Sequence, residues 1–398
     1  MVDDRSSAVS LPEVPLLGVL PGTGGLTRVV DKRKVRRDLA DVFCTSEEGV
    51  RGKRAKEWGF VDELAPTQEF MDRVQARAAD LAGDDTGTEG IPLTALNRVI
   101  DDSGYHYTWV NTTVDRANRT ATITIKAPSD TPPLKVDAIL AEGMDFWPLA
   151  MARELDDAIL MLRTNEHEAG VILLKTKGDG DAVLAVDAAM AANADHWFLR
   201  ETIGMIRRTI ARLDVSSRSM FAIIDEGSCF AGSLFELALA ADRSYMLDIP
   251  KEEGTPPGIA LSDMNFGPLE MANGKSRLAV RFNNDTDKLS ALEADTGTVY
   301  APPEAEDEGL ITFAPDDIDW DDEIRVAVEE RTSLSPDALT GMEANLRFAG
   351  PENLVTKVFG RLTAWQNWIF NRPNAVGENG ALKQFGSGSK PDFDWRRV

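Results

Sequence analysis

The chain has 398 residues, which is too long for one ordinary hydrophobic core and indicates two or three domains. Apolar residues make up 43% and charged residues 27%, a balance typical of a folded globular protein. The formal net charge of -23 repels polyanions and argues against nucleic acid as a partner. No apolar run approaches the roughly 20 residues that span a bilayer, and the N-terminus lacks a signal-peptide core, so we expect a cytoplasmic protein without membrane contact.

The first ninety residues predict one short strand and three helices. The strand is expected over 7–11 and leads into a stretch rich in proline and glycine. Thr23-Gly24-Gly25 offers a helix N-cap, and the helices are expected over 26–42, 46–57 and 68–81. The segment 83–90 is small, acidic and glycine-rich, which is typical of a linker.

After this linker the pattern changes to strands that alternate with helices. Residues 120–125 alternate as a half-buried strand should, whereas 171–174 and 221–224 are continuously apolar. Between the first two strands, residues 147–163 have the apolar spacing of a helix. This order favours an α/β fold with parallel crossover connections.

The chain also resembles itself at two places, in the same order. The segment from Leu11 to Gly18 is echoed from Leu261 to Gly267. The segment 57–66, with the acidic helix after it, is echoed by 308–315 and another acidic helix. Because the second copy follows a long strand-helix region and the first does not, we expect two modules, the first lacking its N-terminal part. We place the C-terminal part of the first module at 1–85, a linker at 86–106, the fuller second module at 107–345, and a helical, then irregular tail at 346–398.

Cysteines and histidines do not form a recognisable site. Cys44 and Cys229 have no neighbouring Cys or His at metal-ligand spacing, so we expect no disulfide and no metal. His106, His167 and His196 are scattered, and none accompanies a Gly-x-Ser-x-Gly elbow. The sequence therefore gives no support to a Ser/His/Asp hydrolase.

The clearest chemical signal lies where the strand 221–224 is followed by a helix that begins near Gly232. A helix start presents free backbone N–H groups and the positive end of the helix dipole, which can stabilise an oxyanion. We therefore take Gly232 and Ser233 as candidates for binding a substrate oxygen. Glu236, one turn into this helix, could transfer a proton or orient a water molecule, although a glutamate on such a helix is often an edge residue.

These segments resemble the crotonase (enoyl-CoA hydratase/isomerase) superfamily. Its Gly-Gly-Gly-x-Glu-Leu-Ala-x-x-x-Asp pattern is approximated by the segment from Gly232 to Asp242. Its second pattern, Pro-Glu-x-x-x-Gly-x-x-Pro-Gly-x-Gly-Gly, is matched by Pro12-Glu13, Gly18, Pro21-Gly22 and Gly24-Gly25. The resemblance implies tandem crotonase-like modules, an acid/base role for Glu13, and a place for Gly22 in the substrate-binding turn. A salt-bridged structural role is the alternative for Glu13, because an unpaired carboxylate is costly to bury.

The second module departs from both patterns. Its glycine triplet is reduced to Gly232-Ser233-Leu234, and Asp263 stands where the first module has Glu13. Asp263 is thus a further catalytic candidate, with a capping or turn role as its alternative. These departures suggest that the second module kept the fold and changed its chemistry.

Further stretches resemble one branch of this superfamily, the lyases that open the ring of an epoxidised benzoyl-CoA. They are 17–28, 31–37, 43–49, 364–370 and 372–377. This resemblance implies conversion of 2,3-epoxybenzoyl-CoA and water into 3,4-dehydroadipyl-CoA semialdehyde and formate, without a cofactor, by a homo-oligomer. A generic enoyl-CoA hydratase or isomerase and a non-catalytic remnant are the alternatives.

One basic run stands out in this acidic chain. It contains Arg28, Lys32, Arg33, Lys34, Arg36 and Arg37. It could offset the phosphates of the acyl-CoA substrate, so Lys32, Arg33 and Lys34 are substrate-binding candidates. A solvated surface is the alternative interpretation.

Overall fold

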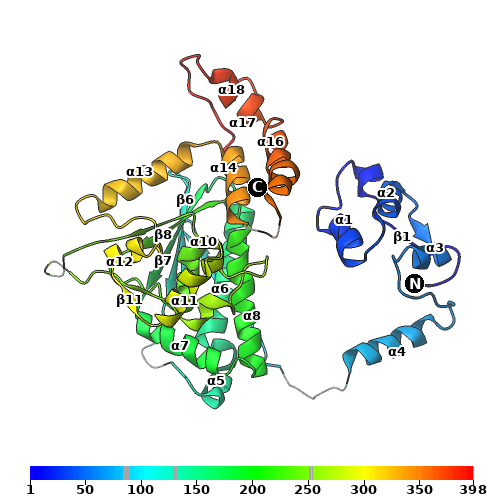
Figure 1. Cartoon of the computed structure of the whole chain (residues 1–398), viewed down its shortest axis with the longest axis horizontal. Helices are drawn as coiled ribbons and strands as arrows, with labels where there is room; N and C mark the ends of the chain where they lie inside the picture. The colour runs from blue at the N-terminus through cyan, green and yellow to red at the C-terminus, as the bar shows by residue number, and fades with distance from the viewer. Residues whose placement is uncertain are drawn as a thin grey trace. The chain divides into compact units, whose positions relative to one another are not determined.

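The structure is a computed structural model that describes residues 1–83, 90–128, 132–250, 252, 254–348, 350 and 352–397. It contains two compact units, Met1–Gly90 and Ile91–Val398, here called unit 1 and unit 2 (Figure 1). The predicted boundary between residues 85 and 86 lies outside the described residues.

Unit 1 is built of short elements around a small apolar core. They are β1 (Ala8–Val9), η1 (Glu13–Leu17), α1 (Gly25–Thr27), η2 (Arg28–Lys32), α2 (Arg37–Thr45), β2 (Val50–Arg51), α3 (Gly52–Glu57) and α4 (Phe70–Ala82). The core contains Val29, Val35, Phe43, Cys44 and Ala55.

Two of the three helices predicted for unit 1 are only partly correct. The helix expected over 26–42 is interrupted after η2, where Lys34 has a φ of 57°, a left-handed conformation that a helix cannot contain. The helix expected over 46–57 begins only at Gly52, because Val50 pairs with Val9 and Arg51 with Ala8 in an antiparallel ladder. The third, expected over 68–81, forms as α4.

Unit 2 contains a seven-stranded sheet in the order β3-β4-β5-β6-β7-β8-β9. Its strands are β3 (Val99–Asp101), β4 (Gly104–His106), β5 (Val110–Asp115), β6 (Thr120–Lys126), β7 (Val171–Lys177), β8 (Ser219–Ile224) and β9 (Arg243–Met246). The strands β3 to β6 pair antiparallel, and β6 to β9 pair parallel, so the predicted crossovers are confirmed. The prediction of a linker up to residue 106 is wrong at its end, because β3 and β4 belong to this sheet.

Helices cover both faces of the parallel strands. On one face, α6 (Trp147–Asn165) and α8 (Trp197–Asp214) lie side by side over the main core (Figure 1). On the other, Phe221, Ile223 and Tyr245 of β8 and β9 contact Ala327 of α13 (Trp320–Ser333).

The remaining early elements of unit 2 are α5 (Val136–Glu142), η3 (Gly143–Asp145), α7 (Gly180–Ala192), η4 (Gly232–Leu234) and α9 (Phe235–Ala240). Later ones are β10 (Ile259–Ala260), η5 (Asp263–Phe266), α10 (Arg277–Arg281), α11 (Thr286–Ala294), β11 (Val299–Tyr300), α12 (Pro302–Asp307) and α14 (Pro336–Arg347).

The two segments that resemble each other in sequence have the same local structure. In unit 1, β1 pairs antiparallel with β2, and α3 and α4 follow. In unit 2, β10 pairs antiparallel with β11, and α12 and α13 follow. After the first helix of each set, α3 or α12, the N–H of Phe60 donates to the carbonyl of Ala55, and the N–H of Leu310 donates to that of Ala305.

An arginine stabilises the same turn in both units. Gly59 and Gly309 have φ values of 83° and 72°, a conformation that favours glycine. The Arg33 Nε donates to the carbonyl of Gly59 at 2.9 Å, and the Arg281 Nε donates to that of Gly309 at 2.6 Å. The internal repeat therefore extends to side-chain contacts.

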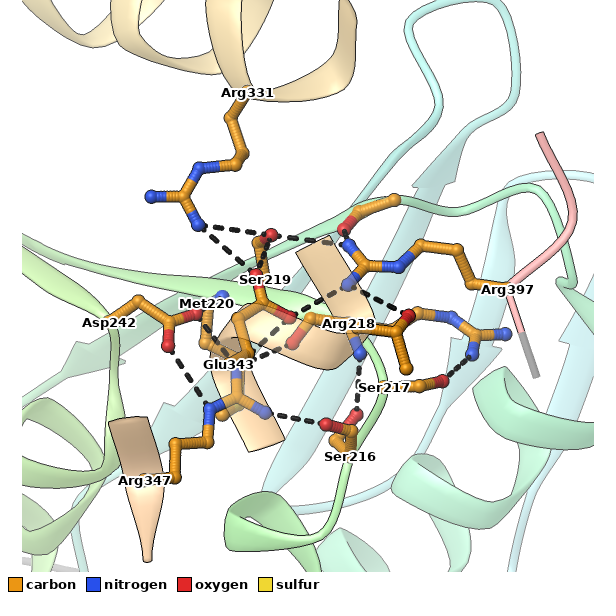
Figure 2. A network of polar contacts seen from close by, with 12 residues as sticks. Ser216, Ser217, Arg218, Ser219, Met220, Asp242, Arg331, Glu343, Arg347 and Arg397 are labelled. Atoms are coloured by element: carbon orange, nitrogen blue, oxygen red, sulfur yellow. Dashed lines mark hydrogen bonds and ion pairs between the residues drawn. The ribbon is translucent and has the colours of Figure 1, made fainter. Parts of the chain in front are cut away.

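The last part of unit 2 is tied to its core. It contains α15 (Leu354–Thr356), η6 (Lys357–Leu362), α16 (Thr363–Ile369), α17 (Pro373–Val376) and α18 (Ala381–Gln384). Near the end, Arg397 is 3% exposed and donates to the Glu343 Oε2 at 2.7 Å and to the carbonyl of Gly170 at 2.9 Å. Figure 2 shows Glu343 at the centre of a network that also includes Arg331 and Ser219.

Candidate functional site

The predicted site residues are divided between the two units, and each group is described by itself. Unit 1 holds Glu13, Gly22, Lys32, Arg33 and Lys34. Unit 2 holds Gly232, Ser233, Glu236 and Asp263.

Glu13 opens the helical turn η1, which Gly18 ends with a φ of 65°. The side chain is half-buried, and its Oε2 is buried without a hydrogen-bond partner among the described residues. The carboxylate lies near the buried Cys44, whose thiol pKa is raised by burial and further by Glu13. A buried carboxylate oxygen without a donor is costly, so a water molecule or a substrate proton would stabilise it.

The turn around Glu13 is apolar and exposed. Gly22 is exposed, and so are the large side chains of Leu16, Leu17, Val19 and Leu20. Contiguous exposed apolar side chains are typical of a surface that binds a ligand or another chain segment. Glu13 therefore lies beside a surface that could receive an apolar group.

The basic run of unit 1 divides into a structural part and an exposed part. Arg33 donates to the carbonyl of Gly59 through two nitrogens and pairs with Asp62 at 3.0 Å. The matching position in unit 2, Arg281, makes the same contact with Gly309, so Arg33 has a structural role that the sequence analysis missed. Lys32 and Lys34 are exposed.

In unit 2 the predicted oxyanion-binding turn is occupied by a side chain of the protein itself. The N–H of Ser233 donates to the Asp187 Oδ2 at 2.6 Å, and the Ser262 Oγ donates to the same oxygen at 2.8 Å. A Cβ added to Gly232, whose φ is 49°, would stand 2.0 Å from this oxygen. The backbone N–H of Ser233, a predicted oxyanion donor, is thus bound to the carboxylate of Asp187, and the binding of a substrate oxygen by Gly232 and Ser233 stays a prediction.

Asp187 is fully enclosed, and burial raises its pKa to about 6. Its Oδ1 and the nearby Ser233 Oγ are buried without partners among the described residues. Because the folded-state pKa lies above the unfolded value, the bound proton stabilises the fold at low pH, and this stabilisation is lost as pH rises through about 6.

We therefore expect Asp187→Asn to gain stability relative to the wild type as pH rises. The gain between pH 5 and pH 8 should be about 1 kcal/mol, because an amide keeps an acceptor oxygen and carries no charge to bury. Urea unfolding of both proteins at several pH values measures it. Asp181→Asn, an exposed position on the same helix, is the control and should show no such trend. The prediction is contradicted if the difference in free energy of unfolding between Asp187→Asn and the wild type does not change with pH.

Glu236 is locked in a buried ion pair. It is 1% exposed, and its Oε2 accepts from the Arg277 Nη1 at 2.8 Å while its Oε1 accepts from the Asn265 Nδ2 at 2.8 Å. Arg277 also binds Asp214 at 2.5 Å. Burial raises the pKa of Glu236, and Arg277 opposes this shift. Both carboxylate oxygens are occupied, so Glu236 has the contacts of a structural residue.

Asp263 does not join this cluster. It is exposed and begins η5, whereas the preceding Ser262 caps that turn by accepting from the N–H of Met264. The residue of η5 that reaches Glu236 is Asn265. Asp263 therefore matches its alternative interpretation, a turn residue, and not an acid/base group beside Glu236.

Sequence reasoning missed the residues that complete the cluster. They are Asp187, Asp214, Ser262, Asn265 and Arg277. One signal was available for Asp187, which is the lone carboxylate within the apolar part of α7. Nothing in the spacing of the others indicated that they would meet.

The described residues contain no grouping of three or more His, Cys, Asp or Glu side chains that could hold a metal ion. Cys44 and Cys229 are both free and buried. None of the helices within the described ranges is long and apolar enough to cross a membrane.

Comparisons with known proteins show the family and the fold. The chain is 58% identical over 401 residues to benzoyl-CoA-dihydrodiol lyase of Aromatoleum evansii. The matched region covers 100% of the chain and 72% of the relative. No family model matches the chain. An enoyl-CoA hydratase of Geobacillus kaustophilus is similar with a TM-score of 0.52 and 16% identity, over 73% of the chain and 98% of that structure. One of Bacillus anthracis gives 0.51 and 17%, over 73% and 100%. The chain thus has a crotonase-like α/β fold.

Proposed function

Because the chain belongs to the benzoyl-CoA-dihydrodiol lyase family, we propose that it is a carbon–carbon lyase that acts on an aromatic acyl-CoA thioester. The observation that carries this proposal is the 58% identity, which extends over the whole chain. The substrate we propose is 2,3-epoxybenzoyl-CoA, and the products are 3,4-dehydroadipyl-CoA semialdehyde and formate.

The chemistry of this reaction needs acid/base groups and a stabilised oxyanion. Two water molecules are consumed, and the reaction needs no external electron acceptor. The thioester carbonyl draws electrons from the ring, so donors to its oxygen favour ring opening and carbon–carbon cleavage. A carboxylate can activate water for attack.

We assign the acid/base role to Glu13. Its sequence pattern matches that of the superfamily without loss, and its Oε2 is buried without a partner among the described residues. The corresponding groups of unit 2 are already engaged, because Asp187 fills the turn at Ser233 and Arg277 holds Glu236. Lys32 and Lys34 are exposed and are proposed to attract the phosphates of coenzyme A.

We further propose that the chain contains two crotonase-like modules, and that unit 1 corresponds to the later part of one. The matching ladders β1–β2 and β10–β11 support this, as do the equivalent contacts of Arg33 and Arg281. The superfamily resemblance also leads us to propose a homo-oligomer that works in the cytoplasm.

The decisive assay supplies the protein with 2,3-epoxybenzoyl-CoA, without added metal or nicotinamide, and measures formate and the CoA product by chromatography. We expect both products in equal amounts. Turnover of crotonyl-CoA with none of the epoxide would favour a generic enoyl-CoA hydratase. Absence of turnover on both substrates would favour a non-catalytic remnant.

A further inference from the structure

A basic cleft lies in unit 2 at the end of the sheet where β9 begins. Its volume is about 460 Å³. Its charged lining consists of Arg243, Arg277, Arg281, Arg331, Arg347 and the two aspartates Asp214 and Asp242. Such a concentration of arginine is unexpected in a chain with a net charge of -23.

Three of the arginines have carboxylate partners. Arg277 binds Asp214, Arg347 binds Asp242, and Arg331 binds Glu343 at 3.1 Å. Arg347 and Arg331 belong to the network of Figure 2, in which Arg397 also uses Glu343. The five arginines of the cleft and Arg397 behind it therefore have only four carboxylates between them within the described residues. These are Asp214, Asp242, Glu236 and Glu343.

The excess positive charge resides on Arg243 and Arg281. Neither forms an ion pair with any carboxylate of the described part of the chain. Both are half-buried, and burial lowers the pKa of Arg281. Arg281 donates to the carbonyl of Gly309 through its Nε alone. Its two terminal nitrogens therefore have no protein partner among the described residues. The guanidinium carbon of Arg243 lies 5.5 Å from the ring centre of Phe221, and its nitrogens make no hydrogen bond within the described residues.

Two half-buried guanidinium groups in a cleft lined by other arginines are unfavourable unless an anion joins them. Arg331 could also donate to such an anion, because only its Nη1 makes hydrogen bonds within the described residues. Guanidinium groups present planar pairs of donors that match the oxygens of phosphate.

We propose that the basic cleft is a binding site for a phosphate group, held by Arg243, Arg281 and Arg331. The residues that line the cleft include neither Glu13 nor Asp187. Leu239, Met271 and Leu346 form an apolar wall beside the arginines. The cleft thus fits a phosphate ester with an apolar body better than inorganic phosphate alone.

The test is a binding titration by calorimetry with inorganic phosphate and with phenyl phosphate, at constant ionic strength maintained with chloride. We expect both to bind, and Arg243→Gln to weaken binding by about tenfold or more, because one charge-assisted contact is lost. The matched control is Arg208→Gln, at an exposed arginine of α8 that has no carboxylate partner among the described residues, and it should bind as the wild type does. Tighter binding of phenyl phosphate would identify an organic phosphate as the ligand, and equal binding would identify phosphate itself.

Arg243→Gln should keep its turnover of the epoxide, so this test is independent of the proposed enzymatic function. The proposal is overturned if neither anion binds, or if Arg243→Gln binds both as tightly as the wild type. A change in oligomeric state in Arg243→Gln, without phosphate binding to the wild type, would also overturn it. That result would assign the cleft to an acidic segment of another chain.

Discussion

Replacing Glu13 by Gln should reduce turnover of 2,3-epoxybenzoyl-CoA by about a hundred- to ten-thousand-fold. Gln keeps the size of the side chain and one acceptor oxygen, but it cannot exchange the proton. Because the Glu13 Oε2 is buried without a hydrogen bond within the described residues, loss of the charge should not destabilise the fold. Steady-state kinetics together with thermal melting separate the two effects.

Glu236→Gln is the matched comparison for this experiment, since it makes the same chemical change in the second unit. It removes one partner of a buried guanidinium, so it should lower the melting temperature and have a much smaller effect on turnover of the folded protein. If Glu236→Gln abolishes turnover while Glu13→Gln leaves turnover almost unchanged, the acid/base residue lies in unit 2 and our assignment is reversed.

Arg277→Met should destabilise unit 2 by roughly 3–5 kcal/mol at neutral pH. Arg277 is 2% exposed and neutralises both Asp214 and Glu236, which are themselves buried. Without it, two carboxylates remain close together in an apolar core, and each raises the pKa of the other. Both would then bind protons more readily in the folded state, so the deficit should shrink as pH falls.

Urea unfolding at pH 8 and pH 5.5 measures this effect and its dependence on pH. Arg325→Met is the control, because Arg325 pairs with Asp322 and Glu329 on the exposed side of α13. Such surface pairs contribute about 0–1 kcal/mol, so this variant should differ little from the wild type. A loss for Arg277→Met no larger than that of the control would show that the buried carboxylates find other partners.

The sequence predicted the parallel part of the sheet because apolar periodicity reports burial directly. Residues 120–125 and 171–174 lie within β6 and β7, and residues 147–163 lie within α6. The helices of unit 1 were less predictable, since the interruption near Lys34 depends on a single backbone angle and not on composition. The strands β3 and β4 were missed because three-residue strands carry too little periodicity to recognise.

The candidate site shows the same division between local and distant information. Sequence motifs located the turn at Gly232 and the glutamate one turn later, and the structure places both at the start of one helical segment. The occupant of that turn comes from a helix more than forty residues earlier, and the partner of the glutamate comes from one forty-one residues later. Pairings over such distances depend on tertiary packing, which periodicity does not encode.

The position of Arg397 has a consequence for how unit 2 is made during translation. The carboxylate of Glu343 is buried. Two of its ion-pair partners, Arg331 and Arg347, are available once α14 has left the ribosome. The third, Arg397, is synthesised some fifty residues later, and it also contacts the carbonyls of Gly170 and His167, which precede β7. Until then the hydroxyl of Ser219, the first residue of β8, lacks one of its hydrogen-bond donors. The nascent sheet can therefore assemble early, but it acquires its complete set of polar contacts only when synthesis of the chain has reached this residue.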